Sequence, residues 1–182
     1  GFGRRHMEVS EAELTGDVLF QVGALEAFCR RHGTAVRYVK AHGALYNDLV
    51  GDVRLAAALV DAVRAYDRTL PVLTLPGSVA AATFVGAGLT VRAEGFPDRA
   101  YSADGTLVPR TVAGAVVSRA EEAAARGARM ALGEPFEAHT GARVLVRVDT
   151  LCIHSDTPGA VGLARALRSA LHDAGVTVRA FS

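Results

Sequence analysis

Four residues that often carry chemistry stand close together, directly after a short apolar run. His42 could act as a general base, a metal ligand or an oxyanion donor. Lys40 is the only lysine of the chain, and it could neutralise a carboxylate or a phosphate. Tyr46 and Asn47 could orient a substrate, or they could only close the turn. We predict that His42 is catalytic. The predicted substrate-binding residues of this stretch are Lys40, Tyr46 and Asn47.

A second group of functional residues lies in two later stretches of the chain. Asp98 and Arg99 could form an acid with its orienting partner, or an ion pair that only stabilises a loop. His154 and Asp156 have a spacing that could bind a metal with His42 as the third ligand, or Asp156 could only cap a helix. We predict no bound metal, and a bound transition metal is the alternative. The predicted catalytic residues are Asp98, His154 and Asp156, and the predicted substrate-binding residues are Arg99 and Arg110.

Apolar periodicity and capping residues predict strands that alternate with helices. Capping boxes are expected at Ser10 with Glu13 and at Ser118 with Glu121, and simple caps at Asp52 and Ser78. The predicted helices cover residues 10–32, the segments opened by Asp52 and Ser78, residues 118–130, and a last segment that ends at Gly175. We expect this last helix to be capped by Asp156 or Thr157, with Pro158 at its first position. The predicted strands cover residues 36–40, 71–75, 89–94, one long or two short strands within 144–153, and 176–180. Residues 95–110 form a long polar connection.

Helical spacing of apolar residues predicts which helix faces are buried. The expected buried stripes are Leu14, Val18, Val22, Leu25 and Phe28 in the first helix, Leu55, Leu59, Val63 and Tyr66 in the second, and Val161, Ala164, Leu167 and Leu171 in the last.

The order of elements indicates an α/β fold built from parallel βαβ units. A doubly wound sheet and an (α/β) barrel both fit this order. At this length we expect one α/β domain over residues 1–182. In either architecture the loops after the strand carboxyl ends form the active face, so residues 40–47, 94–99 and 154–156 would share it.

The composition argues against several classes of protein. Lys and Arg total 20 against 19 Asp and Glu, and the charges are interspersed, so no nucleic-acid or membrane-surface partner is expected. No run of about eighteen residues is apolar, and the start does not resemble a signal peptide, so we expect a cytoplasmic protein without membrane spans. Neither a Gly-x-x-x-x-Gly-Lys-Ser/Thr loop nor a Gly-x-Ser-x-Gly elbow is present.

Five stretches, in order, resemble the motifs of the LamB/YcsF family. They begin at Gly1 (Gly-Phe-Gly-Arg-Arg-His-Met), Val39 (Val-Lys-Ala-His-Gly-Ala-Leu-Tyr-Asn), Glu94 (Glu-Gly-Phe-Pro-Asp-Arg-Ala-Tyr), Gly105 (Gly-Thr-Leu-Val-Pro-Arg) and Cys152 (Cys-Ile-His-Ser-Asp-Thr-Pro). The resemblance implies a (β/α) barrel of the glycoside hydrolase/deacetylase type. It also implies ATP-dependent opening of 5-oxoproline (pyroglutamate) to L-glutamate, with ATP and Mg²⁺ as cofactors and two further 5-oxoprolinase subunits as partners.

That activity suggests roles for the predicted site residues. Lys40 and Arg99 would hold anionic groups of the small-molecule substrate or of a phosphorylated intermediate. His42 or His154 would transfer protons, and a predicted catalytic aspartate would orient water or a histidine.

The chain departs from the family pattern at three positions within these motifs. Ala41 stands where the family usually has proline, Pro97 where it has alanine, and Ser155 where it has glycine. The family's opening strand and its acidic and histidine-containing motifs lie upstream of Gly1, so we expect a barrel that is incomplete at the N-terminus. Two other functions stay open, a metal-dependent deacetylase or amidase of the same barrel type and a non-catalytic substrate-binding subunit.

Overall fold

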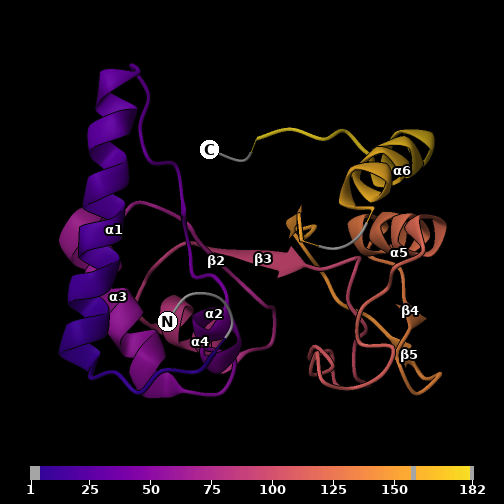
Figure 1. Cartoon of the computed structure of the whole chain (residues 1–182), viewed down its shortest axis with the longest axis horizontal. Coiled ribbons are helices and arrows are strands. Elements are labelled where there is room, and N and C mark those ends of the chain that lie inside the picture. The colour runs from indigo at the N-terminus through magenta and orange to yellow at the C-terminus, as the bar shows by residue number, and fades with distance from the viewer. Residues whose placement is uncertain (1–4, 157–158, 181–182) are drawn as a thin grey trace. The chain divides into compact units, whose positions relative to one another are not determined.

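The computed structural model describes residues 5–156 and 159–180 of the chain (Figure 1). The chain forms two compact units, the first up to Arg92 and the second from Ala93. Strand β3 (Val91–Gly95) runs from the first unit into the second. Whether both units belong to one domain over residues 1–182, as the sequence suggests, stays a prediction.

The first unit contains a parallel strand pair with helices before and after each strand. Val39 of β1 lies opposite Val72 of β2, and Lys40 lies opposite Leu73. The elements of this unit are, in order, α1 (Glu11–Arg31), β1 (Val39–Lys40), α2 (Ala44–Asp48), α3 (Val53–Asp67), β2 (Val72–Thr74) and α4 (Val79–Gly86).

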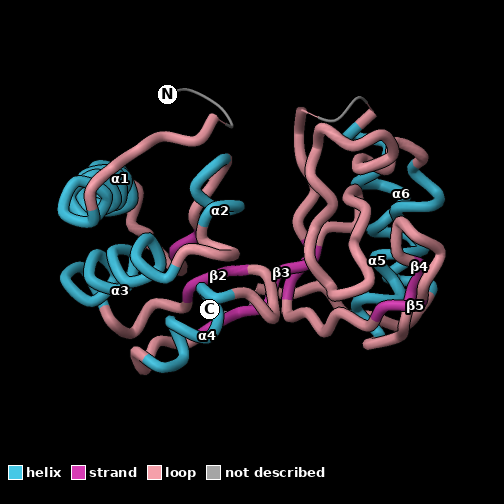
Figure 2. Tube along the Cα trace, turned by 90° about the horizontal axis from the view of Figure 1, so that it is seen from below, coloured by secondary structure: helices cyan, strands magenta, loops and turns pink. Residues whose placement is uncertain are grey.

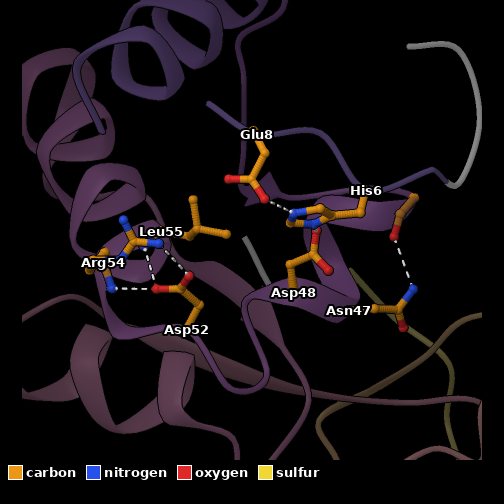
Figure 3. A network of polar contacts seen from close by, with 8 residues as sticks. His6, Glu8, Asn47, Asp48, Asp52, Arg54 and Leu55 are labelled. Atoms are coloured by element: carbon orange, nitrogen blue, oxygen red, sulfur yellow. Dashed lines mark hydrogen bonds and ion pairs between the residues drawn. The ribbon is translucent and has the colours of Figure 1, made fainter. Parts of the chain in front are cut away.

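Side-chain caps fix where the helices of the first unit begin. The Ser10 hydroxyl accepts a hydrogen bond from the backbone N–H of Glu13 at 3.2 Å, and the Glu13 carboxylate accepts one from the backbone N–H of Ser10 at 2.9 Å. Asp52 caps α3 by accepting from the backbone N–H of Arg54 (Figure 3), and Ser78 caps α4 by accepting from the backbone N–H of Ala81. The predicted capping box and both predicted caps are therefore confirmed.

Helices α1 and α3 lie side by side, as Figure 1 and Figure 2 show. Helix α3 buries Leu55, Leu59 and Val63 as predicted, whereas Tyr66 is only half-buried. The stripe predicted for α1 is wrong, because Leu14 is its only buried residue within the described chain and Phe28 is 67% exposed. A helix that packs mainly against one neighbour buries only the narrow strip that faces it, so apolar spacing overestimates its buried surface. The exposed or half-buried members of that stripe are Val18, Val22, Leu25 and Phe28.

The second unit combines a parallel strand pair with an antiparallel hairpin and two packed helices. Glu94 of β3 lies opposite Thr150 of β6, and Phe136 of β4 lies opposite Val144 of β5. Helices α5 and α6 lie side by side (Figure 1, Figure 2) and share a buried cluster that includes Ala124 and Leu167. The elements after β3 are α5 (Ala120–Leu132), β4 (Phe136–Glu137), β5 (Arg143–Val144), β6 (Thr150–Leu151) and α6 (Ala160–Asp173).

Two predicted helix starts in this unit are wrong. Helix α5 begins at Ala120 with Arg119 as its N-cap, so Ser118 stands one position too early for its hydroxyl to cap the helix. The N-cap of α6 is Gly159 in the left-handed conformation, at φ 79°, rather than Asp156. The alternative cap Thr157 and the predicted first residue Pro158 lie outside the described residues.

The strand and core predictions for the second half of the chain hold in part. Within residues 144–153, only Val144 at the end of β5 and the two residues of β6 lie in strands, so two short strands are found in place of one long strand. Residues 176–180 form no strand because no ladder neighbour pairs with them in the described chain. Residues 36–38 likewise lie outside β1. Helix α6 buries Leu167 and Leu171, but Val161 is 67% exposed and Ala164 is exposed, so the predicted stripe is wrong at its N-terminal half. None of the helices in the described chain is both long and apolar enough to cross a membrane.

We expect Gly95→Ala to lower the free energy of unfolding by about 1–3 kcal/mol, because the new methyl group would enter a filled space. A Cβ at this position in β3 would lie 2.8 Å from Val148 Cγ1, 3.2 Å from Met130 Sδ and 3.3 Å from Leu151 Cδ2. The matched control is Gly162→Ala in α6, where nothing lies within 4 Å and alanine should stabilise the helix by up to about 1 kcal/mol. Denaturant unfolding measures both variants. Equal stabilities would show that the space around Gly95 is not filled.

Candidate functional site

Asp98 and His154 form a hydrogen-bonded pair in the second unit. Asp98 follows β3 and His154 follows β6, and these two strands are parallel neighbours whose carboxyl ends lie at one edge. The Asp98 carboxylate is fully buried, at 0% exposed. Its Oδ2 atom accepts hydrogen bonds from His154 Nδ1 at 2.8 Å and from the His154 backbone N–H at 3.2 Å. The structure thus brings together two of the predicted catalytic side chains.

The protonation of this pair follows from the surroundings of Asp98. Burial raises the pKa of the Asp98 carboxyl, but its hydrogen bonds to His154 and the charge of that ring outweigh burial and hold the pKa below its ordinary value. Asp98 is therefore ionised at neutral pH and can only accept hydrogen bonds. His154 Nδ1 must carry the proton that joins the two side chains. The other ring nitrogen, Nε2, is left to exchange a proton with a ligand.

Phe96 contacts the His154 ring, and Tyr101 in turn binds the backbone of Phe96. Phe96 stacks on the imidazole with ring centroids 5.6 Å apart and an angle of 21° between the ring planes. The Tyr101 hydroxyl accepts a hydrogen bond from the Phe96 backbone N–H at 2.9 Å. Burial raises the pKa of Tyr101, so its hydroxyl stays neutral and serves as a fixed hydrogen-bonding group. The sequence prediction did not assign either residue to the site, although both are aromatic residues in the long polar connection.

The other predicted residues of the second unit have different surroundings. Arg99 is only 4% exposed, and its guanidinium donates to the backbone carbonyls of Val108 at 2.6 Å and Ala115 at 3.2 Å. These contacts fold the long connection onto itself. Arg110 is half-buried near the end of that connection, and Asp156 is exposed. Substrate binding by Arg99 and Arg110 and catalysis by Asp156 stay predictions.

The predicted residues of the first unit gather where β1 leads into α2. Lys40 is half-buried, and its Nζ atom lies 5.8 Å from the centre of the buried Tyr46 ring, an arrangement typical of a cation–π contact. His42 is exposed. Asn47 donates its side-chain amide to the Gly43 carbonyl at 3.1 Å, which closes the first turn of α2 (Figure 3).

A cavity of about 320 Å³ in the first unit includes Lys40 and His42 in its lining. Arg5 adds a further cationic side chain, whereas Asp17 and Asp48 are acidic. The rest of the lining is mostly apolar and comes largely from α1, β1 and α3. A cavity of this size, with a few charged groups on apolar walls, suits a small charged molecule.

His6 makes a contact beside this cavity that the sequence did not reveal. Figure 3 shows its ring between two carboxylates, with Nδ1 2.9 Å from Asp48 Oδ2 and Nε2 3.1 Å from Glu8 Oε1. The hydrogen bonds to Asp48 and Glu8, with attraction to their charges, raise the pKa of His6. Asp48 is distant in sequence, so only the neighbouring Glu8 could have given a signal. The ring joins the segment before α1 to α2.

In residues 5–156 and 159–180, no three or more His, Cys, Asp or Glu side chains lie close enough together to hold a metal ion.

Comparisons with known proteins agree on one family. Residues 1–182 match a family model described as the LamB/YcsF family. A relative from Streptomyces avermitilis, named as the A subunit of 5-oxoprolinase, is 52% identical over 182 residues, which cover 100% of this chain and 73% of the relative. A relative of the same name from Thermus thermophilus is 49% identical over 181 residues, which cover 100% of this chain and 72% of the relative.

The fold has a solved counterpart. The crystal structure of a protein described as the lactam utilization protein from Thermus thermophilus matches with a TM-score of 0.93 and 49% identity. The match covers 100% of this chain and 72% of that chain. Together with the parallel strand pairs and the helices between the strands, it confirms the predicted α/β barrel class.

We expect His154→Ala to lower the free energy of unfolding by about 2 kcal/mol near pH 7, because the buried Asp98 carboxylate loses the hydrogen bond from the His154 ring. The pKa of Asp98 is lower in the folded chain than in the unfolded chain. The contribution of the ionised Asp98 carboxylate to the free energy of unfolding is therefore present above the unfolded pKa of about 3.9. It is lost as the pH falls through the pKa of the folded chain. Unfolding measured at several pH values should show the difference between wild type and variant shrinking below about pH 4.

The control for this measurement is His172→Ala, which removes an exposed histidine of α6 whose ring pairs with the exposed Asp173. Its effect should stay within about 0.5 kcal/mol. If His154→Ala loses the same stability at every pH value, the loss of the pair with ionised Asp98 is not the cause.

Proposed function

The chain belongs to the LamB/YcsF family, and we propose that it is the A subunit of a 5-oxoprolinase that opens 5-oxoproline to L-glutamate. The main support is the match over the whole chain with relatives of that name at about 50% identity. Because those relatives are named as one subunit of an enzyme, the name implies a complex of several subunits. We propose two partner subunits and a requirement for ATP with Mg²⁺. The proposed reaction is hydrolysis of a cyclic amide in the cytoplasm.

The Asp98–His154 pair supplies chemistry that such a reaction needs. Opening a lactam forms a C–O bond at the carbonyl carbon, breaks the C–N bond and transfers a proton to the departing nitrogen. His154 Nε2 can accept a proton from the attacking water and deliver it to that nitrogen. The ionised Asp98 stabilises the imidazolium that forms between these two transfers. Phe96, stacked on the ring, keeps its plane fixed while the proton moves.

ATP and Mg²⁺ are proposed as requirements of the whole complex. ATP would activate the stable lactam carbonyl by transferring its terminal phosphoryl group to the carbonyl oxygen, which releases ADP, and the group would leave as inorganic phosphate when the carboxylate forms. The sequence contains no glycine-rich phosphate loop with lysine, so ATP would bind in another mode or on another subunit. No step assigned to this chain passes through either group.

His154 is the better supported of the two predicted proton-transfer residues. It has a buried carboxylate partner on Nδ1 and an aromatic ring against its face. His42 is exposed, and it lines the cavity of the first unit. Within that unit, Lys40 is proposed to hold an anionic group of the substrate, with Tyr46 beneath it. Roles for His42 and Asn47 stay predictions.

We expect His154→Gln to lower kcat by about 10²–10⁴-fold in the complex reconstituted with both partner subunits, because glutamine cannot shuttle a proton. The measurement is ATP hydrolysis that depends on 5-oxoproline. His172→Gln serves as the matched control and should keep full activity. Full activity of His154→Gln would remove the base assignment, and loss of activity in His42→Ala alone would transfer that assignment to His42. If the complete wild-type complex hydrolysed no ATP in response to 5-oxoproline, the proposed function itself would be wrong.

We expect Lys40→Met to raise KM for 5-oxoproline by about 10–100-fold with a smaller change in kcat, because a charge-assisted hydrogen bond to the substrate carboxylate is lost. Steady-state kinetics of the same complex measure both constants. The control is Arg37→Met, which removes an exposed cation from the segment just before β1. An unchanged KM would show that Lys40 does not bind the substrate.

A further inference from the structure

Two adjacent residues of α5 contact the residues on either side of Asp98. A Cβ placed on Gly127 would lie against Pro97, which precedes Asp98 in the chain. Arg126 donates from Nη1 to the backbone carbonyl of Arg99, which follows Asp98, at 2.6 Å. Pro97 and Asp98 are fully buried, and the Arg126 side chain is only 12% exposed. Helix α5 therefore contacts both the residue before and the residue after the predicted catalytic Asp98.

The approach at Gly127 is tighter than an ordinary van der Waals contact for a residue with a side chain. An added Cβ would lie 3.1 Å from Pro97 Cγ and 3.4 Å from Pro97 Cβ, and 2.3 Å from Leu167 Cδ1. The Leu167 methyl group is the end of a flexible side chain and can rotate away. The proline ring is closed on the backbone nitrogen, so beyond a change of ring pucker it moves only with the chain. We expect a side chain at position 127 to push on the ring of Pro97 and, through it, on the backbone next to Asp98.

The hydrogen bonds of Asp98 leave little tolerance for such a displacement. One of its two bonds to His154, from the backbone N–H, already has a length of 3.2 Å, at the long end of the normal range. The loop is also anchored elsewhere, because the Val117 N–H donates to the Asp98 carbonyl and the Phe96 N–H donates to Tyr101, both at 2.9 Å. These anchors oppose movement of the loop as one body, so we expect a shift of Pro97 to be taken up at Asp98.

We propose that Gly127 and Arg126 are positioning residues that keep the Asp98 carboxylate at hydrogen-bonding distance from His154. Gly127 does so by allowing α5 to approach Pro97, and Arg126 does so by holding the carbonyl of Arg99. The effect on catalysis rests on the proposed function, whereas the effect on the hydrogen bond does not.

The test is Gly127→Ala, observed through the downfield Nδ1–H resonance of His154 in the proton NMR spectrum of the full chain. Lengthening the bond to Asp98 should move this resonance upfield. In the reconstituted complex kcat should fall by about 10–100-fold, as expected when a catalytic group is misplaced, while KM for 5-oxoproline stays within about twofold. The control Gly162→Ala, in open space on α6, should change neither quantity.

Two second-site variants separate the routes by which Gly127→Ala could act. Adding Pro97→Ala removes the ring carbon that the new methyl group would meet and should restore the resonance. Adding Leu167→Ala removes the other close contact and should not restore it. The opposite pattern would overturn the role of Pro97, and an unmoved resonance in Gly127→Ala alone would overturn the proposal for Gly127.

Arg126 gives a second test that does not depend on the folding of Gly127→Ala. Arg126→Gln should move the His154 resonance upfield, and Arg126→Lys, which keeps a charged donor, should move it less. Equal shifts in both variants, or none, would overturn the role of Arg126. A moved resonance with undiminished turnover would leave the positioning role intact and show instead that the Asp98–His154 pair does not perform the proposed reaction.

Discussion

The site in the second unit depends on one carboxylate that has been removed from water. A buried ionised group is tolerated only when donors replace the water that it has lost. Asp98 finds two of them in a single residue, the ring and the backbone N–H of His154. The interaction therefore orients the imidazole and also fixes the chain after β6 against the chain after β3. Folding and preorganisation of the site follow from the same pair of hydrogen bonds.

The long connection after β3 is ordered by a buried arginine instead of by regular secondary structure. Arg99 donates to the carbonyls of Val108 and Ala115, and isolated bridges join Arg99 to Val116 and Tyr101 to Leu107. A guanidinium has five N–H donors in a fixed planar arrangement, so one side chain can donate hydrogen bonds to carbonyls from separate turns of a loop. This role explains how a cation can be almost fully buried beside the site. It does not require that Arg99 binds substrate.

Local signals predicted the starts of α1, α3 and α4 in the first unit correctly but those of α5 and α6 wrongly. The capping box of Ser10 and the caps at Asp52 and Ser78 involve groups within three residues, and all were confirmed. Features that depend on distant neighbours were predicted less well. Val161 has helical spacing but lies on an exposed face, and residues 176–180 have strand-forming side chains but pair with no strand in the described chain. Spacing identifies which residues can be buried or paired, whereas the packing partner decides which of them are.

The predicted site residues show the same limit more sharply, since they include one histidine in each unit that the sequence could not rank. Both His42 and His154 follow a strand, and parallel topology predicts that such residues lie at strand carboxyl ends. Their chemistry differs because of residues that are far away in sequence. His154 lies against Phe96 and donates to Asp98, whereas His42 is exposed. Asp98 in turn is held through contacts of its neighbours with α5, which no motif around Asp98 reveals. A motif can therefore supply the carboxylate and the histidine, but we infer that the helix packed behind the loop sets the distance between them.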